Sequence, residues 1–110
     1  MKNNARQNNR VQVEMKIRSV NLPGFSADLV DLSVGGARVI LSGKPSQNIL
    51  EERIRFGVSL PSQMSAQFEG FARVCWVKET ARGIEAGLQW EKMTNADWRR
   101  ADALVSLSAA

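Results

Sequence analysis

The sequence predicts a mainly-β domain, a six-stranded antiparallel β-barrel followed by a C-terminal α-helix. In six short segments apolar side chains alternate with polar ones, and Gly and Pro separate most of these segments. This pattern is typical of half-buried strands joined by turns. After Met93 the apolar spacing changes to that of a helix. The length of 110 residues fits a single domain.

Three strands are expected in the first half of the chain. Residues 11–18 alternate strictly between apolar and polar side chains, which predicts the first strand. The turn-forming segment 21–24 follows, and a second strand is expected over 26–32. A third strand over 37–41 is ended by Ser-Gly-Lys-Pro at 42–45.

Three further strands are expected before Met93. Apolar residues at every second position predict a strand over 53–60. A longer extended segment, 66–78, is expected to bend or bulge near Gly70. The last strand, 84–90, alternates again, and its polar face is expected to carry Glu85 and Gln89.

The C-terminal segment has the pattern of an amphipathic helix. Thr94 followed by Asp97 resembles an N-cap with an acidic residue in the first turn. An apolar stripe that starts at Trp98 recurs at helical spacing, so the helix is expected to pack on the barrel. The chain is therefore divided into an arginine-bearing N-terminal segment, a barrel and a packed helix, at 1–10, 11–93 and 94–108.

The composition narrows the functional classes. Histidine is absent, which removes the commonest general base and the commonest metal ligand. The single cysteine, Cys75, excludes an internal disulfide and a cysteine-rich metal site. No apolar run approaches the roughly 20 residues that span a bilayer, and the polar start does not resemble a secretory signal. We expect a cytoplasmic binding module, with no enzymatic activity, metal, cofactor or membrane insertion.

The excess positive charge lies at the N-terminal end. Residues 1–18 carry five basic side chains and one acidic side chain, whereas 19–110 carry ten of each. This distribution favours an anionic partner near the first strand. A solvated basic tail would have the same composition.

Two short motifs lie on either side of the first strand. Arg6 and Arg10 are four residues apart in a polar segment, and Asp-Leu-Ser-Val-Gly-Gly occupies 31–36. Strand alternation puts Asp31 and Ser33 on the same face. The two glycines are expected to allow positive φ and close approach of a ligand to the backbone.

Together these motifs resemble the signature of the PilZ family, R-x-x-x-R followed after one strand by [D/N]-x-S-x-x-G. The resemblance extends over nearly the whole chain. It implies a PilZ-type barrel that binds cyclic-di-GMP and signals the ligand level to an effector protein or fused domain. By this resemblance, segment 1–10 is a flexible arm that becomes ordered on binding. The ligand-binding residues that it implies are Arg6, Arg10, Asp31, Ser33, Gly35 and Gly36.

The residue types suit such a ligand. The arginine fork pairs bidentately with phosphate or with the O6/N7 edge of guanine. Asp31 can accept hydrogen bonds from guanine N1–H and N2–H₂, and Ser33 can reach a phosphate or the base. Ala5 stands where some family members carry a further arginine and bind a ligand dimer, so the ligand stoichiometry is left open.

Other residues are weaker candidates for the same site. Trp90 ends the last strand and could stack on a base, whereas Trp76 and Trp98 are expected to be packing residues. Arg38 and Gln89 point away from their apolar neighbours and could line the same surface.

Two alternative functions fit the sequence less well. One is a basic β-barrel that binds single-stranded nucleic acid. The other is a PilZ-like adaptor that has lost ligand binding. The positive charge is confined to one end, which counts against nucleic acid, and both motifs are intact, which counts against the adaptor. We therefore favour cyclic-di-GMP, and the resemblance implies motility, exopolysaccharide or biofilm control as the process.

Overall fold

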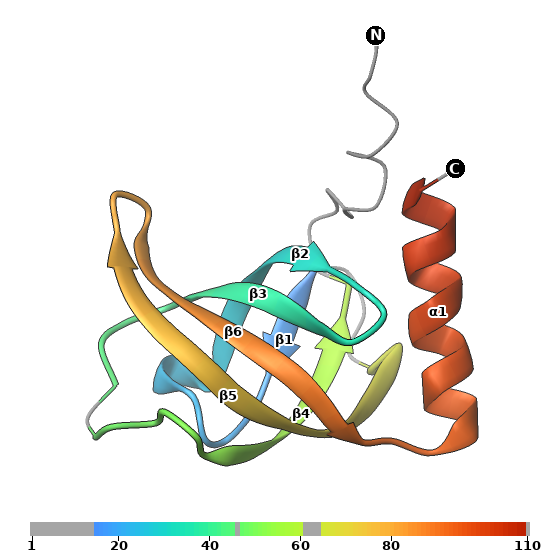
Figure 1. Cartoon of the computed structure of the whole chain (residues 1–110), viewed down its shortest axis with the longest axis horizontal. Helices are drawn as coiled ribbons and strands as arrows, with labels where there is room; N and C mark the ends of the chain where they lie inside the picture. Colours follow the sequence, from blue (N-terminus) through green and yellow to red (C-terminus); the bar gives the residue numbers. More distant parts are fainter. Residues whose placement is uncertain (1–14, 46, 61–64, 110) are drawn as a thin grey trace, which may run out of the picture.

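The barrel is closed and entirely antiparallel. The computed structural model describes residues 15–45, 47–60 and 65–109 (Figure 1). Neighbouring strands follow the order β1-β2-β3-β6-β5-β4, and β4 pairs with β1 to close the barrel. The predicted six-stranded barrel with one C-terminal helix is therefore confirmed. The elements are β1 (Lys16–Arg18), a short 3₁₀ turn η2 (Pro23–Phe25), β2 (Ser26–Leu32), β3 (Gly36–Leu41), β4 (Arg53–Ser59), β5 (Phe68–Thr80), β6 (Gly83–Lys92) and α1 (Asn95–Ala109).

Most predicted strand bounds agree with the structure to within about two residues, the usual uncertainty of such limits. Residues 11–14 of the predicted first strand, and the whole segment 1–10, lie outside the described residues. A register shift does occur near Gly70, between Phe71 and Ala72, but its extra residue is Glu91 on β6, so the expected bulge lies in the partner strand.

The barrel interior is filled by apolar side chains from all six strands. At its centre the Trp90 and Phe56 rings stack with centroids 4.6 Å apart, and Phe68 meets both rings edge-on. Aromatic pairs in these geometries add stabilisation beyond that of simple area burial. The buried apolar residues are Met15, Ile17, Leu22, Ala27, Leu29, Leu32, Val39, Leu41, Ile49, Ile54, Phe56, Val58, Phe68, Ala72, Val74, Ala86, Leu88, Trp90 and Ala101.

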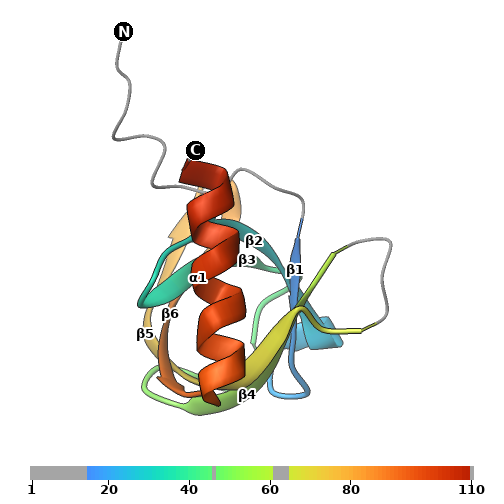
Figure 2. The same ribbon diagram turned by 90° about the vertical axis from the view of Figure 1, so that its right-hand side faces the viewer.

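Helix α1 stands along one side of the barrel (Figure 2). The predicted cap is present, because the Thr94 hydroxyl accepts a hydrogen bond from the Asp97 backbone N–H at 3.1 Å. Asp97 also accepts a hydrogen bond from the Glu69 backbone N–H on β5 at 3.2 Å, which ties the helix to the barrel. Ala101 is buried, and Trp98 is partly buried against the core. In the described part of the chain, no helix has the length and apolar character needed to cross a membrane.

A separate charged network covers the outer face of β4, β5 and β6. Glu91 contacts both Arg73, at 2.7 Å, and Arg53, at 3.6 Å. The hydrogen bond from Arg73 to Glu91 raises the pKa of the Arg73 guanidinium. The Arg53 guanidinium also lies 4.6 Å from the centre of the Phe71 ring. Exposed ion pairs of this kind contribute little to stability. We therefore expect this network to have little effect on the free energy of unfolding.

Candidate functional site

A hollow of about 500 Å³ opens on the outer surface, where β2, β3, β6 and β5 lie side by side. We call it the outer hollow. It receives Asp31 and Ser33 of the second sequence motif, together with the weaker candidates Arg38 and Gln89. The polar and aromatic lining residues used below are Asp31, Ser33, Arg38, Trp76 and Gln89.

A bulge in β2 turns Asp31 toward this surface. Leu29 pairs with Val39 and Asp31 pairs with Arg38, so Val30 is an extra residue opposite β3. Leu29 points into the barrel and is buried. Without the extra residue, strict alternation would have pointed Asp31 into the barrel as well. The bulge therefore places the carboxylate in the outer hollow with Ser33.

Arg38 joins two carboxylates beside the hollow. Its guanidinium contacts Asp31 at 2.7 Å and Glu85 at 3.7 Å. The sequence predicted Glu85 on the outer, polar face of the last strand, but its side chain is only 6% exposed. It also accepts a hydrogen bond from the Thr80 hydroxyl at 3.0 Å. Arg38 thus holds Asp31 in place and neutralises a covered carboxylate.

Because Arg38 holds Asp31 and neutralises Glu85, its replacement should change the stability of the domain. We expect Arg38→Met to lower the free energy of unfolding by about 1–2 kcal/mol, between the values for exposed and buried pairs, because Glu85 loses its cation. Chemical denaturation at neutral pH measures this change. The double variant Arg38→Met/Glu85→Gln should recover part of the loss. A double variant no more stable than the single one would contradict the charge explanation.

Hydrogen bonds to the Gly35 and Gly36 carbonyls stabilise the loop from Ser33 to Gly36. The Ser33 backbone N–H and hydroxyl both donate to the Gly36 carbonyl, at 2.9 and 3.2 Å. The Trp90 backbone N–H donates to the Gly35 carbonyl at 2.9 Å. These bonds fix the Ser33 hydroxyl at the edge of the outer hollow.

The reason for the two glycines differs from the prediction. Among the described glycines, positive φ occurs only at Gly24 and Gly83, so the expected left-handed conformation at Gly35 and Gly36 is wrong. Gly36 is buried, and a Cβ there would collide with the Leu88 carbonyl oxygen of β6. Gly35 is exposed, with open space where a Cβ would lie. Gly36 is thus required by strand packing and also lines the outer hollow, whereas Gly35 is exposed but does not line it.

The aromatic residue of the outer hollow is Trp76, which the sequence assigned to packing. Val74 pairs with Leu88 and Trp76 pairs with Gly87, so Cys75 is an extra residue and forms a second bulge. This bulge turns Trp76 outward, where it is 39% exposed. Its indole covers Gly87, because a Cβ at that position would collide with the ring. The sequence carried no clear signal for this placement, because the pairing of Trp76 with Gly87 is known only from the structure.

Trp90 does not fit its suggested role. It is 5% exposed and stacks on Phe56 inside the barrel. We therefore remove Trp90 from the candidate ligand residues, because a ring in the core has no free face for a base. Its inward position follows from the alternation of Ala86, Leu88 and Trp90, all of which are buried.

The arginine pair, Arg6 and Arg10, lies outside the described residues. The first described residue is Met15, whose carbonyl accepts a hydrogen bond from the Leu29 backbone N–H at 3.0 Å. The chain therefore enters the barrel beside β2, with Met15 next to Leu29, which precedes Asp31 by two residues. In the described part of the chain no group of three side chains could hold a metal ion.

The closed barrel and the packed helix define a small antiparallel β-barrel domain with one C-terminal helix. The chain belongs to the PilZ domain family, whose model matches residues 4–107. Its structure is similar to the PilZ domain with c-di-GMP of YcgR from Escherichia coli, with a TM-score of 0.65, 13% identity, and coverage of 89% of this chain and 86% of that chain.

A second similar structure is the inhibitor of motility MotI/DgrA from Bacillus subtilis. Its TM-score is 0.62 at 18% identity, and the match covers 87% of this chain but 44% of that protein. No curated protein sequence matches the chain significantly. At these identities the two structures establish the shared fold.

Proposed function

We propose that this domain binds cyclic-di-GMP at the outer hollow and thereby regulates a partner protein or a fused domain. The observation that carries the proposal is that Asp31, Ser33 and the exposed Trp76 share one hollow. Membership of the PilZ family supports the same ligand, as does the similarity to the YcgR PilZ domain, whose structure contains c-di-GMP. We further propose that the protein acts in the cytoplasm, in motility, exopolysaccharide or biofilm control, and as a receptor rather than an enzyme.

The path of the chain supports a role for the arginine pair. Met15 follows Arg10 by five residues, and five extended residues span at most about 17 Å. Asp31 lies two residues beyond Leu29, the hydrogen-bond partner of Met15, which is about 7 Å along a strand. Arg10 can therefore reach the outer hollow without any change in the barrel.

Each group of the hollow has a ligand atom that it suits. One Asp31 oxygen contacts Arg38, and a carboxylate has further lone pairs that can accept from guanine N1–H and N2–H₂. The arginine forks match the phosphates or the guanine O6/N7 edge. Ordering five arm residues costs ~1–2 kcal/mol each. A micromolar complex, about −8 kcal/mol, therefore needs several of these contacts together.

Calorimetric titration of the whole chain with cyclic-di-GMP tests the proposal and gives the stoichiometry. We expect saturable binding, and weaker binding of cyclic-di-AMP, because adenine lacks the O6 acceptor and the N1–H and N2–H₂ donors. Absence of saturable binding would refute the proposal. Salt-sensitive binding of single-stranded oligonucleotides, with no preference for the cyclic dinucleotide, would instead support the nucleic-acid alternative.

Trp76 provides an independent spectroscopic prediction. We expect cyclic-di-GMP to change the tryptophan fluorescence, and Trp76→Ala to weaken binding by about tenfold, since stacking on one base contributes ~1–3 kcal/mol. Trp76→Phe should bind nearly as well but lose the fluorescence change. The matched control is Trp98→Phe, because Trp98 packs between α1 and the barrel core. A fluorescence change that persists in Trp76→Phe would exclude contact with this ring.

A further inference from the structure

We propose that the turn between β1 and β2 is a docking surface for an acidic segment of a partner protein that also carries a large apolar side chain. We call this surface, formed by Arg18, Val20, Phe25 and Arg55, the turn patch. It lies at the start of β2, whereas the outer hollow lies at its end. The inference goes beyond the proposed function and does not depend on ligand binding.

Two large apolar side chains of the turn face solvent. Val20 is 79% exposed and Phe25 is 67% exposed, the highest values among the large apolar residues that the structure describes. Phe25 also has a φ of 64°, in the left-handed region that bulky residues rarely adopt. The folded domain therefore gains neither burial nor relaxed backbone from a phenylalanine here. Such strain at an exposed site points to a role outside the isolated fold.

Hydrogen bonds hold the backbone of this turn in place. The Ser19 backbone N–H donates to the Phe25 carbonyl at 3.1 Å, and the Phe25 N–H donates to the Leu22 carbonyl at 2.9 Å. Leu22 is buried beneath the turn. The Ser42 hydroxyl donates to the Pro23 carbonyl from the β3–β4 connection. A surface already fixed in this way loses little conformational freedom on binding.

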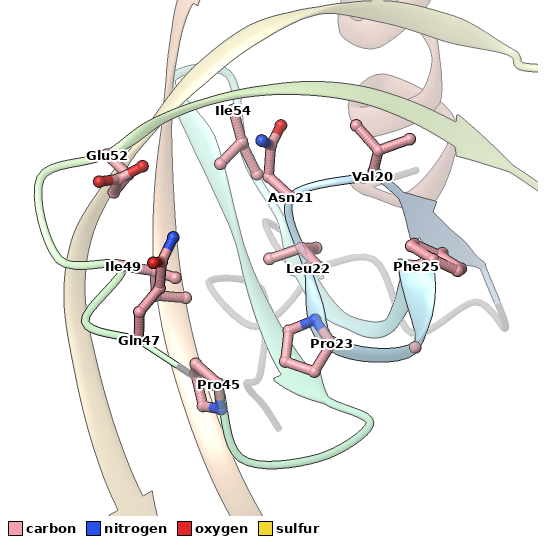
Figure 3. Close-up of a pocket in the computed structure, with 11 residues that line it drawn as sticks. Val20, Asn21, Leu22, Pro23, Phe25, Pro45, Gln47, Ile49, Glu52 and Ile54 are labelled. Atoms are coloured by element: carbon pink, nitrogen blue, oxygen red, sulfur yellow. The ribbon is translucent and has the colours of Figure 1, made fainter.

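Hollows flank the turn on two sides. One, of about 370 Å³, lies between the turn and the β3–β4 connection and has Ile49 and Ile54 in its lining (Figure 3). The other, also of about 370 Å³, is lined by Phe25, Arg18, Arg55 and Glu69. Paired hollows beside a protruding ring fit the side chains of a peptide segment better than the flat surface of a membrane.

The charges of the turn patch indicate an acidic partner. Within the described residues neither Arg18 nor Arg55 forms an ion pair, and Arg18 donates to the Ser59 hydroxyl at 3.1 Å. Two such arginines beside exposed apolar side chains complement a carboxylate next to a large apolar residue. Glu69 in this hollow and Glu52 in the other repel a carboxylate and an anionic lipid headgroup alike, so the choice of protein over membrane depends on the shape of the two hollows.

Selection of a random-peptide library against the immobilised chain tests this inference. We expect the enriched peptides to combine Asp or Glu with Leu, Phe or Trp. Synthetic copies should bind Phe25→Asn and Arg55→Glu at least about tenfold more weakly than wild type, as for hot-spot residues. Phe25→Asn should fold normally, because asparagine tolerates positive φ. The matched controls are Leu50→Ser and Arg82→Glu, which change an exposed apolar residue and an exposed arginine elsewhere and should bind as wild type does.

The remaining outcomes separate the alternatives. Enriched peptides that lack acidic residues, or that bind Phe25→Asn as tightly as wild type, overturn the inference, as does a selection that enriches nothing. Binding to phosphatidylglycerol–phosphatidylethanolamine vesicles that Phe25→Asn abolishes would overturn it in favour of a membrane. A dimer lost in the same variant would overturn it in favour of a second copy of the chain. Each variant should bind cyclic-di-GMP as wild type does. The ligand proposal and the docking proposal can therefore fail independently of each other.

Discussion

We expect the double variant Arg6→Ala/Arg10→Ala to bind cyclic-di-GMP at least about 100-fold more weakly than the wild-type chain, because each bidentate guanidinium contact contributes ~1–3 kcal/mol. The two side chains differ from lysine in their planar fork, which matches phosphate and the guanine edge. Titration calorimetry on both proteins measures the difference. Thermal unfolding of the variant shows whether the barrel is intact.

A control of equal charge separates the fork from simple attraction. Lys2→Ala/Lys44→Ala also removes two positive charges, one from the N-terminal segment and one from an exposed loop. We expect this control to lose much less affinity than the arginine variant, because lysine has no planar fork to pair with phosphate or the guanine edge. Arg6→Lys/Arg10→Lys keeps the charge and should still bind poorly. Equal binding by all three variants would remove the arginine pair from the site.

The sequence predicted the strands and the helix because their signals are local. Each strand shows period-two alternation along its own residues, and the Thr94–Asp97 cap is contained in four consecutive positions. The order of the strands along the chain could therefore be predicted. Their order around the barrel could not, because β3 pairs with β6 instead of β4, and a pattern within one strand does not identify its neighbour.

The site was harder to predict because it depends on two bulges. Val30 and Cys75 are extra residues relative to β3 and β6, and neither strand shows this in its own pattern. Each bulge reverses the facing of the next residue, which turns Asp31 and Trp76 outward. The sequence thus identified the acid by its motif but assigned the wrong tryptophan to the surface. Gly87 leaves space for the Trp76 ring, but that the two residues lie opposite each other is shown only by the strand pairing.

Packing between strands also explains why the signature glycine matters. Gly36 pairs with Gln89 at the start of β3, where β3 runs against β6. A methyl group at Gly36 would overlap the Leu88 carbonyl oxygen, and backbone atoms of a paired strand cannot move aside as a flexible side chain can. The same substitution at Gly35 meets no atom within 4 Å. The two neighbouring glycines therefore form a matched pair for experiment.

We expect Gly36→Ala to lower the free energy of unfolding by about 3 kcal/mol or more, at the upper end of overpacking effects, because the β3–β6 pairing must open to admit the methyl group. Gly35→Ala should leave stability nearly unchanged. Urea denaturation of the two variants measures the contrast. Gly36→Ala should also weaken cyclic-di-GMP binding, since the Gly36 carbonyl accepts both hydrogen bonds from Ser33. If Gly36→Ala were as stable as Gly35→Ala, the glycine would be required by the ligand rather than by the barrel.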